Sequence, residues 1–243
     1  MKIKGLIIHL QRARERLPQV QKIMSECPFP CEVVHAIDGA TMDEGFKTGY
    51  QVNLLSPVYP FQLRPSEVAA FHSHRKCWQK ILDDKLDGGL VLEDDVEFNS
   101  ESFKRVLDLA TRSSGKNDYI RIPHRNNEKI REVLHEEGDL KIFRAKEVAL
   151  GAQAQLVTAG AARSLLELTK CFDRPIDTYI QMRWQHGVRV LSIQRSFIRE
   201  ISADLGGSTI QKKTPLLSKL RREINRFIYR RKVSQLSQGP NQP

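Results

Sequence analysis

The fold is decided by a short apolar run that ends on three acids, Gly88-Gly89-Leu90-Val91-Leu92-Glu93-Asp94-Asp95-Val96. A run of this length suits a buried strand, and acids at its carboxyl end stand where open α/β sheets place their ligand crevice. Three adjacent carboxylates repel one another, and they stay ionised together most easily around a hard cation such as Mg²⁺ or Mn²⁺. The stretch therefore predicts a divalent-metal site beside a diphosphate. A solvated turn or an acidic helix N-terminus fits the same residues.

A helix is predicted immediately before this strand, over residues 65–82, because apolar residues recur there near helical spacing. Three motifs lie in it and precede the strand: Glu67, then Ser73-His74, then Trp78. This order, followed by a strand that ends in Val-Leu-Glu-Asp-Asp-Val, resembles glycosyltransferase family 25. That family includes bacterial lipooligosaccharide sugar transferases and the collagen galactosyltransferases.

The resemblance covers residues 3–210, and its other pieces follow in the family's order. The opening strand and loop are matched by Ile7-Ile8-His9-Leu10, Arg12 and Arg16, with His9 where asparagine is usual. A second strand ends in Asp38-Gly39, a later segment has Gln155 where an aromatic residue is usual, and Pro175-Ile176-Asp177 matches a "PxD" motif.

This resemblance implies an α/β, GT-A-like nucleotide-sugar-binding fold over residues 1–210, with a mostly parallel central sheet. The pattern also alternates strands and helices, which is typical of such a sheet. The implied activity is inverting transfer of galactose or glucose from a UDP-sugar to a lipopolysaccharide or lipooligosaccharide core saccharide, with Mn²⁺ or Mg²⁺ as cofactor. The alternative is a catalytically silent subunit that binds a nucleotide sugar or a saccharide, because His9 and Gln155 depart from the family pattern.

The resemblance also implies roles for the acidic triad in binding the donor. Asp95 is expected to hold the metal, Asp94 to hold the metal or its water shell, and Glu93 to contact the nucleotide. Glu67 is placed with the nucleotide-sugar-binding residues.

Three further residues near the start of the chain are candidates for donor binding. Asp38 follows a predicted strand and is expected to meet the uridine base or ribose, although a turn-forming aspartate is equally ordinary there. Arg12 and Arg16 are expected to meet the diphosphate, and a solvated helix start explains them almost as well.

An inverting transferase needs a general base for the acceptor hydroxyl. Asp177 is the first candidate, since Pro175 stiffens its loop and the resembling family keeps an acid there. Capping of the helix that follows is the alternative role for Asp177. His74 is the second candidate, although a histidine on an apolar-faced helix is more often structural.

The basic charge is concentrated at the C-terminal end. The formal net charge is +10, and residues 211–243 hold nine basic side chains against Glu223 alone, so residues 1–210 are nearly neutral. A basic amphipathic helix is predicted over 211–233, and residues 234–243 are expected to be a disordered tail. The apolar face of this helix consists of Leu216, Leu217, Leu220, Ile224, Phe227 and Ile228.

Two kinds of partner fit such a helix. An anionic membrane surface is favoured, since each Lys or Arg contributes about 1 kcal/mol there and the apolar face adds burial. Alternatively the apolar face packs on the domain or on a second subunit of a homo-oligomer. Nucleic acid is not expected, because Phe227 and Tyr229 form no stacking platform and no recognised motif is present.

The expected cellular location follows from the length of the apolar runs. None approaches the roughly 18 residues needed to span a bilayer, and no secretory signal is recognised at the start. We therefore expect a cytoplasmic protein, peripheral on the inner face of a bacterial inner membrane, that acts on a lipid-anchored saccharide.

Overall fold

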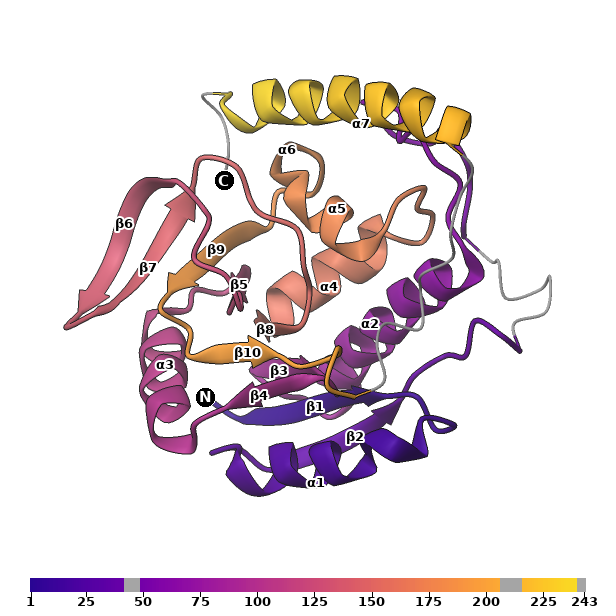
Figure 1. The fold of residues 1–243 in the computed structure, drawn as a ribbon. Coiled ribbons are helices and arrows are strands. Elements are labelled where there is room, and N and C mark those ends of the chain that lie inside the picture. Colours follow the sequence, from indigo (N-terminus) through magenta and orange to yellow (C-terminus); the bar gives the residue numbers. More distant parts are fainter. Residues whose placement is uncertain (42–48, 206–215, 240–243) are drawn as a thin grey trace.

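The computed structural model describes residues 1–41, 49–205 and 216–239, and in the last range it describes side chains from residue 222 (Figure 1). The strands are β1 Ile3–His9, β2 Cys31–His35, β3 Gly88–Glu93, β4 Val96–Phe98, β5 Asp118–Arg121, β6 Ile130–Glu137, β7 Leu140–Ala145, β8 Ala154–Thr158, β9 Arg189–Gln194 and β10 Ile198–Glu200. The helices are a 3-10 turn Arg14–Arg16, α1 Leu17–Glu26, α2 Pro65–Asp83, α3 Ser100–Ser113, α4 Ala159–Leu168, α5 Ile176–Gln181, α6 Arg183–His186 and α7 Leu216–Ser237.

Eight strands form one sheet in the order β2-β1-β3-β8-β5-β9-β7-β6. The strand pairings make β7 and β8 run opposite to the other six strands. The mixed α/β fold with a mostly parallel central sheet is therefore confirmed. β4 lies outside this sheet and pairs antiparallel with β10.

Helices cover both faces of the sheet, and β3 shows how the sequence divides between them. Successive side chains of a strand point to opposite faces. Val91 belongs to the core under α2 and α4, whereas Leu90 and Leu92 belong to the core under α1 and α3. Since β3 is covered on both sides, all three residues are fully buried, and the continuous apolar run is explained.

A close helix contact fixes the position of β3. A Cβ added at Gly89 would lie 2.7 Å from Ile81 Cγ1 of α2 and 3.1 Å from Leu6 Cδ1 of β1. Only glycine lets α2 pack this near to the strand, so the helix that carries His74 and the strand that carries Glu93 are held in direct contact.

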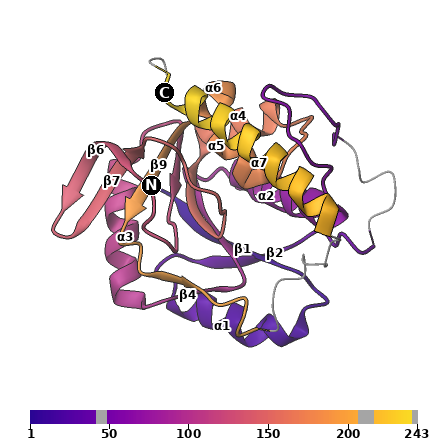
Figure 2. The same ribbon diagram turned by 45° about the horizontal axis from the view of Figure 1, so that its top comes forward.

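The C-terminal helix α7 lies across α4, α5 and α6 (Figures 1 and 2). The predicted helix is present, and it ends at Ser237, four residues beyond the expected boundary at 233. The face that packs on the domain contains Tyr229 and Val233. Ile224 and Phe227, by contrast, are 52% and 65% exposed, so the alternative in which they pack on the domain is wrong. The side chains of Leu216, Leu217 and Leu220 lie outside the described residues.

One buried arginine explains which face of α7 packs. Arg174 is fully buried, and it donates to Tyr229 Oη of α7 (2.9 Å), to Asp173 Oδ1 (2.6 Å) and to the carbonyl oxygens of Leu55 and Pro57 (both 3.1 Å). Because a buried charge needs its partners, Arg174 holds α7 and the segment around residue 56 to the domain. Among the described residues, no helix is long and apolar enough to cross a membrane.

Candidate functional site

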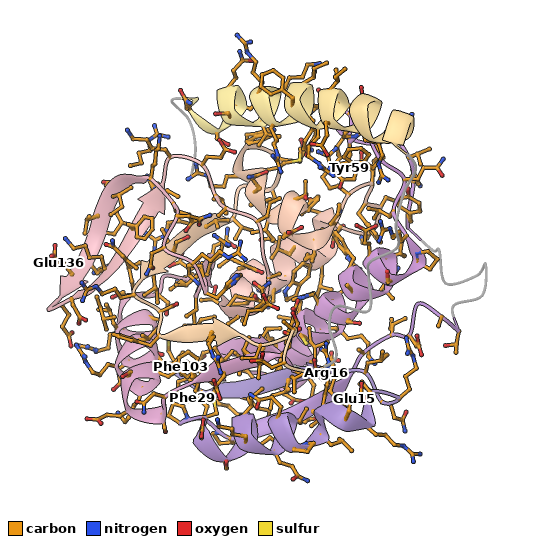
Figure 3. The ribbon with its side chains drawn as sticks, viewed as in Figure 1. Glu15, Arg16, Phe29, Tyr59, Phe103 and Glu136 are labelled. Carbon is orange, nitrogen blue, oxygen red and sulfur yellow. The ribbon has the colours of Figure 1, made fainter. Side chains whose placement is uncertain are left out.

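The three acids of the motif occupy the end of β3 and the tight turn into β4, and each has a different environment. Asp94 is buried and paired: His9 Nδ1 donates to its Oδ2 (2.7 Å) and Arg16 Nη1 donates to its Oδ1 (2.5 Å). His9 therefore supplies a hydrogen bond at the position where the resembling family has asparagine. These contacts tie the β3–β4 turn to β1 and to the segment before α1, where Figure 3 labels Arg16.

Asp95 is less completely paired. Arg16 Nη1 lies 3.4 Å from its Oδ2, and its Oδ1 is buried without a hydrogen-bond partner among the described residues. Burial, and then the charge of Glu93, raise the pKa of Asp95 to about 7, while Arg16 acts in the opposite direction. Asp95 is the acid of the triad that has an oxygen with no hydrogen-bond partner among the described residues and an environment that favours added positive charge.

Glu93 borders the same space, and 33% of its side chain is accessible. The protein around it desolvates the carboxyl, and this, followed by the charges of Asp94 and Asp177, raises the pKa of Glu93 to about 8. Carboxyl groups with strongly perturbed pKa values are typical of functional sites.

His74 is buried behind Glu93 and takes part through it. Gln155 Nε2 donates to His74 Nδ1 (3.2 Å), so the proton of the neutral ring is on Nε2, which lies 3.5 Å from Glu93 Oε1. Burial lowers the pKa of His74 to about 4, although Asp177 opposes this shift. With Nδ1 occupied and Nε2 protonated, His74 orients Glu93 and is poorly placed to act as a base. Gln155, the departure from the family pattern, is what fixes the ring.

Asp177 is brought to this site from α5. Its Oδ1 accepts from the backbone N–H of Thr178 (2.7 Å), and its Oδ2 accepts from that of Gly151 (3.0 Å). Its charge helps to raise the pKa of Glu93 and opposes the lowered pKa of His74, so it lies near both side chains. Asp177 is the second residue of α5 and Pro175 holds its N-cap position without a side-chain cap, so the capping role expected as the alternative is wrong, and the contact with Thr178 lies within the first turn of the helix.

The remaining predicted residues lie apart from the triad. Arg12 Nε donates to Asp38 Oδ2 (2.6 Å) at the end of β2, and this contact, with the N–H of Ala40, lowers the pKa of Asp38. Arg12 is 56% exposed at its side chain, so the pair is accessible to a ligand. Glu67 Oε2 accepts from the N–H of Arg64 (2.7 Å), which makes it a helix-start residue of α2. The triad, Arg12, Arg16 and Asp38 thus follow the carboxyl ends of β1, β2 and β3, whereas Glu67 and His74 belong to α2 and Asp177 to α5.

One acid of the site was missed from the sequence. Glu200 of β10 pairs in register with Val96, directly after the triad, and its charge contributes to the raised pKa values of Glu93 and Asp95. Ser202 Oγ donates to Glu200 and helps to lower its pKa. A strand of three residues has no periodicity to detect, and only the pairing of β10 with β4 brings Glu200 here.

The residues fit a divalent cation that also binds substrate phosphates. Within the described ranges, no group of three or more metal-ligating side chains is preassembled. Mg²⁺ usually takes only one or two carboxylates, with substrate phosphates and water as its other ligands. The Oδ1 of Asp95, which has no partner in the described part of the chain and lies next to Glu93, meets that need, whereas Asp94 is already engaged by His9 and Arg16.

Comparison with known proteins gives the class. A sequence model of glycosyltransferase family 25, described as LPS biosynthesis protein, matches residues 2–180. The chain therefore belongs to glycosyltransferase family 25.

Individual relatives are distant. Procollagen galactosyltransferase 2 of Mus musculus is 31% identical over 106 residues, which are 42% of this chain and 17% of that protein. Inactive glycosyltransferase 25 family member 3 of Mus musculus is 30% identical over 106 residues, which are 42% of this chain and 18% of that protein. The chain thus spans under a fifth of the length of these relatives.

A solved structure also resembles the fold. The crystal structure of S. aureus TarS 1-349 in complex with UDP-GlcNAc aligns with 90% of this chain and 61% of that chain, at 12% identity and a TM-score of 0.44. At this TM-score the likeness carries no conclusion about function.

Proposed function

We propose that the chain is an inverting, metal-dependent hexosyltransferase that moves galactose or glucose from a UDP-sugar to a lipopolysaccharide or lipooligosaccharide core saccharide. The observation that carries the proposal is the buried Asp95 oxygen, unpartnered among the described residues, beside Glu93 at the carboxyl end of β3. Membership of family 25 supports sugar transfer. The family description supports a lipopolysaccharide acceptor, and the name of the mouse galactosyltransferase supports galactose.

The chain's own residues divide the work of donor binding. Asp95 holds Mn²⁺ or Mg²⁺, and Asp94 holds Arg16 and the turn in place. When bound, the cation stabilises the charge of the departing diphosphate. Glu93, oriented by His74, contacts the ribose, and the Arg12–Asp38 pair contacts the base or the phosphates.

Asp177 acts as the general base on the acceptor hydroxyl. Its Oδ1 accepts from both the backbone N–H and the hydroxyl of Thr178, whereas its Oδ2 accepts only the N–H of Gly151 and keeps a lone pair for a further hydrogen bond. The backbone contacts fix the carboxylate, so it can be held within hydrogen-bond reach of a bound hydroxyl.

A catalytically silent binding subunit is the second candidate, because a relative at 30% identity is named inactive. The complete triad favours the enzyme, since a protein that only binds has little need to hold three repelling acids together. Binding without turnover would distinguish this candidate.

A screen of nucleotide sugars tests the donor proposal. Ligands that bind only the folded state raise the melting temperature. We expect UDP-galactose or UDP-glucose to raise the melting temperature with Mn²⁺ present and to have little effect on it with EDTA. GDP-mannose, which carries guanine in place of uracil, serves as the control for recognition of the nucleobase. If no UDP-sugar stabilises the protein in Mn²⁺, the proposed donor is wrong.

We further propose that α7 holds the protein on an anionic membrane surface, on the cytoplasmic side of a bacterial inner membrane. Ile224, Phe227 and Ile228 are 52%, 65% and 48% exposed on the side of the helix away from Tyr229 and Val233. An exposed apolar stripe on a basic helix suits insertion at the level of the lipid headgroups, next to a lipid-anchored acceptor.

Replacement of Ile224 and Phe227 by serine is expected to release the full chain from acidic-lipid vesicles. Both side chains are exposed, so the domain should keep its melting temperature, and transfer to a soluble acceptor should be unaffected. Co-sedimentation with vesicles measures the effect, and Met24→Ser on α1, a change of an exposed apolar residue elsewhere (40%), is the matched control. Equal sedimentation of the double variant and the wild type would contradict the membrane role.

A further inference from the structure

A large cleft lies beside the proposed catalytic site, between α7 and two loops. Its volume is about 1040 Å³, at the upper end of ordinary small-molecule sites. One wall comes from the second half of α7, and the other comes from residues 121–131 and 146–153. Gln153 and Thr178 also line the cleft. Glu93 N–H donates to Gln153 O (2.8 Å), and Thr178 follows Asp177, so one end of the cleft adjoins the site.

The lining of this cleft is strongly basic. It holds seven Lys and Arg side chains against two acids. One of the acids, Glu128, is buried and already pairs with Arg121. Among the described residues, five lining cations form no ion pair: Arg125, Lys129, Arg131, Lys146 and Arg230. The rest of the domain is nearly neutral, so this excess is a local feature.

A buried arginine next to the cleft adds to the positive charge. Arg183 is fully buried and has no carboxylate partner among the described residues; its Nη2 donates to the carbonyl oxygens of Lys146 (3.2 Å) and Ser237 (3.4 Å), and its Nε and Nη1 have no acceptor there. Burial, and then Arg131 and Arg144, lower its pKa to about 10. An anion placed among these cations would relieve their mutual repulsion.

Aromatic side chains form the part of the cleft nearest Asp177. The ring of Tyr59 lies 5.6 Å from that of Phe61 and 5.4 Å from that of Tyr229, and all three line the cleft. Figure 3 labels Tyr59 next to α7. Burial, then the charges of Glu67 and Asp177, raise the pKa of Tyr59, so this aromatic group lies near the proposed base. Aromatic side chains offer an apolar face with a polar edge, which suits the faces of sugar rings.

We propose that this cleft binds the acceptor, and that the acceptor is an acidic saccharide, with a sugar ring against Tyr59 and an anionic group among Arg131, Lys146 and Arg230. This inference rests on the proposed function and narrows its acceptor class. Guanidinium groups bind phosphate and carboxylate by the same paired hydrogen bonds, so either group on the saccharide fits.

Binding of small saccharides to the full chain tests this directly. The probes are trigalacturonic acid, which carries carboxylates, maltotriose phosphate, which carries a phosphate, and neutral maltotriose. We expect at least one acidic probe to bind about tenfold or more tightly than maltotriose, because a hydrogen bond to a charged group contributes about 1.5–3 kcal/mol. The probe that binds identifies the anionic group.

Neighbouring residues of α7 provide a matched pair of variants. Arg230 lines the cleft and Arg231 does not, and both are exposed. Arg230→Gln should weaken the acidic probe about tenfold or more and leave maltotriose and UDP unchanged. Arg231→Gln, with the same loss of charge as Arg230→Gln, should leave all probes unchanged.

Three results would overturn the inference. They are equal binding of acidic and neutral probes, equal weakening by Arg231→Gln, and tighter binding of a short oligothymidylate than of either acidic saccharide. UDP binding in the same samples separates this inference from the proposed function. Loss of UDP binding with retained saccharide binding refutes the donor proposal alone.

Discussion

Replacement of Asp95 by asparagine is expected to abolish the Mn²⁺-dependent binding of UDP-sugars, with an affinity loss of at least about 100-fold, because a cation at such a site contributes several kcal/mol of charge stabilisation. The substitution keeps the size of the side chain and removes the charge that holds the cation. Calorimetry with UDP and Mn²⁺ measures the loss. Asp139→Asn, which removes a carboxylate from the turn between β6 and β7, is the matched control and should bind UDP as the wild type does.

In the absence of metal, Asp95→Asn is expected to preserve or raise the stability of the fold, although it abolishes donor binding. The pKa of Asp95 is raised from 3.8 to about 7, so the folded state holds this proton more tightly than the unfolded chain does. The protonated carboxyl of Asp95 therefore stabilises the folded state fully below pH 3.8, and this stabilisation is lost as the pH rises through 7. At about pH 8 without metal, Asp95→Asn should melt at or above the wild-type temperature. Mn²⁺ should also stabilise the wild type more at about pH 8 than at about pH 6, since the proton competes with the cation. For the binding prediction, unchanged UDP affinity in Asp95→Asn would mean that the triad is only a solvated strand end.

Replacement of Asp177 by asparagine is expected to lower kcat for transfer by about 100-fold or more, the scale of general base catalysis, with little change in donor affinity. Asparagine keeps an oxygen that accepts the N–H of Thr178, so a role limited to the start of α5 would survive the change. A variant that retains most of its turnover would therefore restrict Asp177 to that structural role. Glu67→Gln, at the start of α2, is the control for loss of a helix-start carboxylate.

The main elements of the sheet were predictable from the sequence because their apolar patterns are strong. The opening strand, the strand that ends at Glu93 and the helix before it all follow from their apolar patterns. β6 was not predicted, because Ile130–Glu137 is rich in charge and lies at the sheet edge with most of its side chains exposed. β4 and β10 have three residues each and depend on each other for pairing.

The place of the site was predictable, but the environment of each acid was not. The position of Glu93-Asp94-Asp95 after a buried strand could be inferred from neighbouring residues alone. That Asp94 is engaged by His9 and Arg16, and that Asp95 keeps an oxygen with no partner among the described residues, depends on contacts between segments about 80 positions apart. The basic cleft likewise requires α7 to lie near the loop around residue 128, which no local pattern indicates.

The packing of α7 also depends on a contact that local sequence patterns do not indicate. The sequence marks Ile224, Phe227 and Ile228 as one apolar stripe, and the structure leaves that stripe exposed. The packed face was missed because its anchor is the hydroxyl of Tyr229 on the buried Arg174, a polar contact that hydrophobic periodicity does not detect. The helix therefore packs one face on the domain and leaves a separate apolar face exposed.

The central proposal, transfer of a hexose from a UDP-sugar, is tested most directly by measuring UDP release with the full chain, Mn²⁺ and UDP-galactose or UDP-glucose, with and without a core-saccharide acceptor. We predict release that requires both the acceptor and Mn²⁺ and that is lost in Asp95→Asn. UDP binding without release in the presence of core-saccharide acceptors would contradict the enzyme and support a silent subunit, and equal release without acceptor would instead indicate a hydrolase.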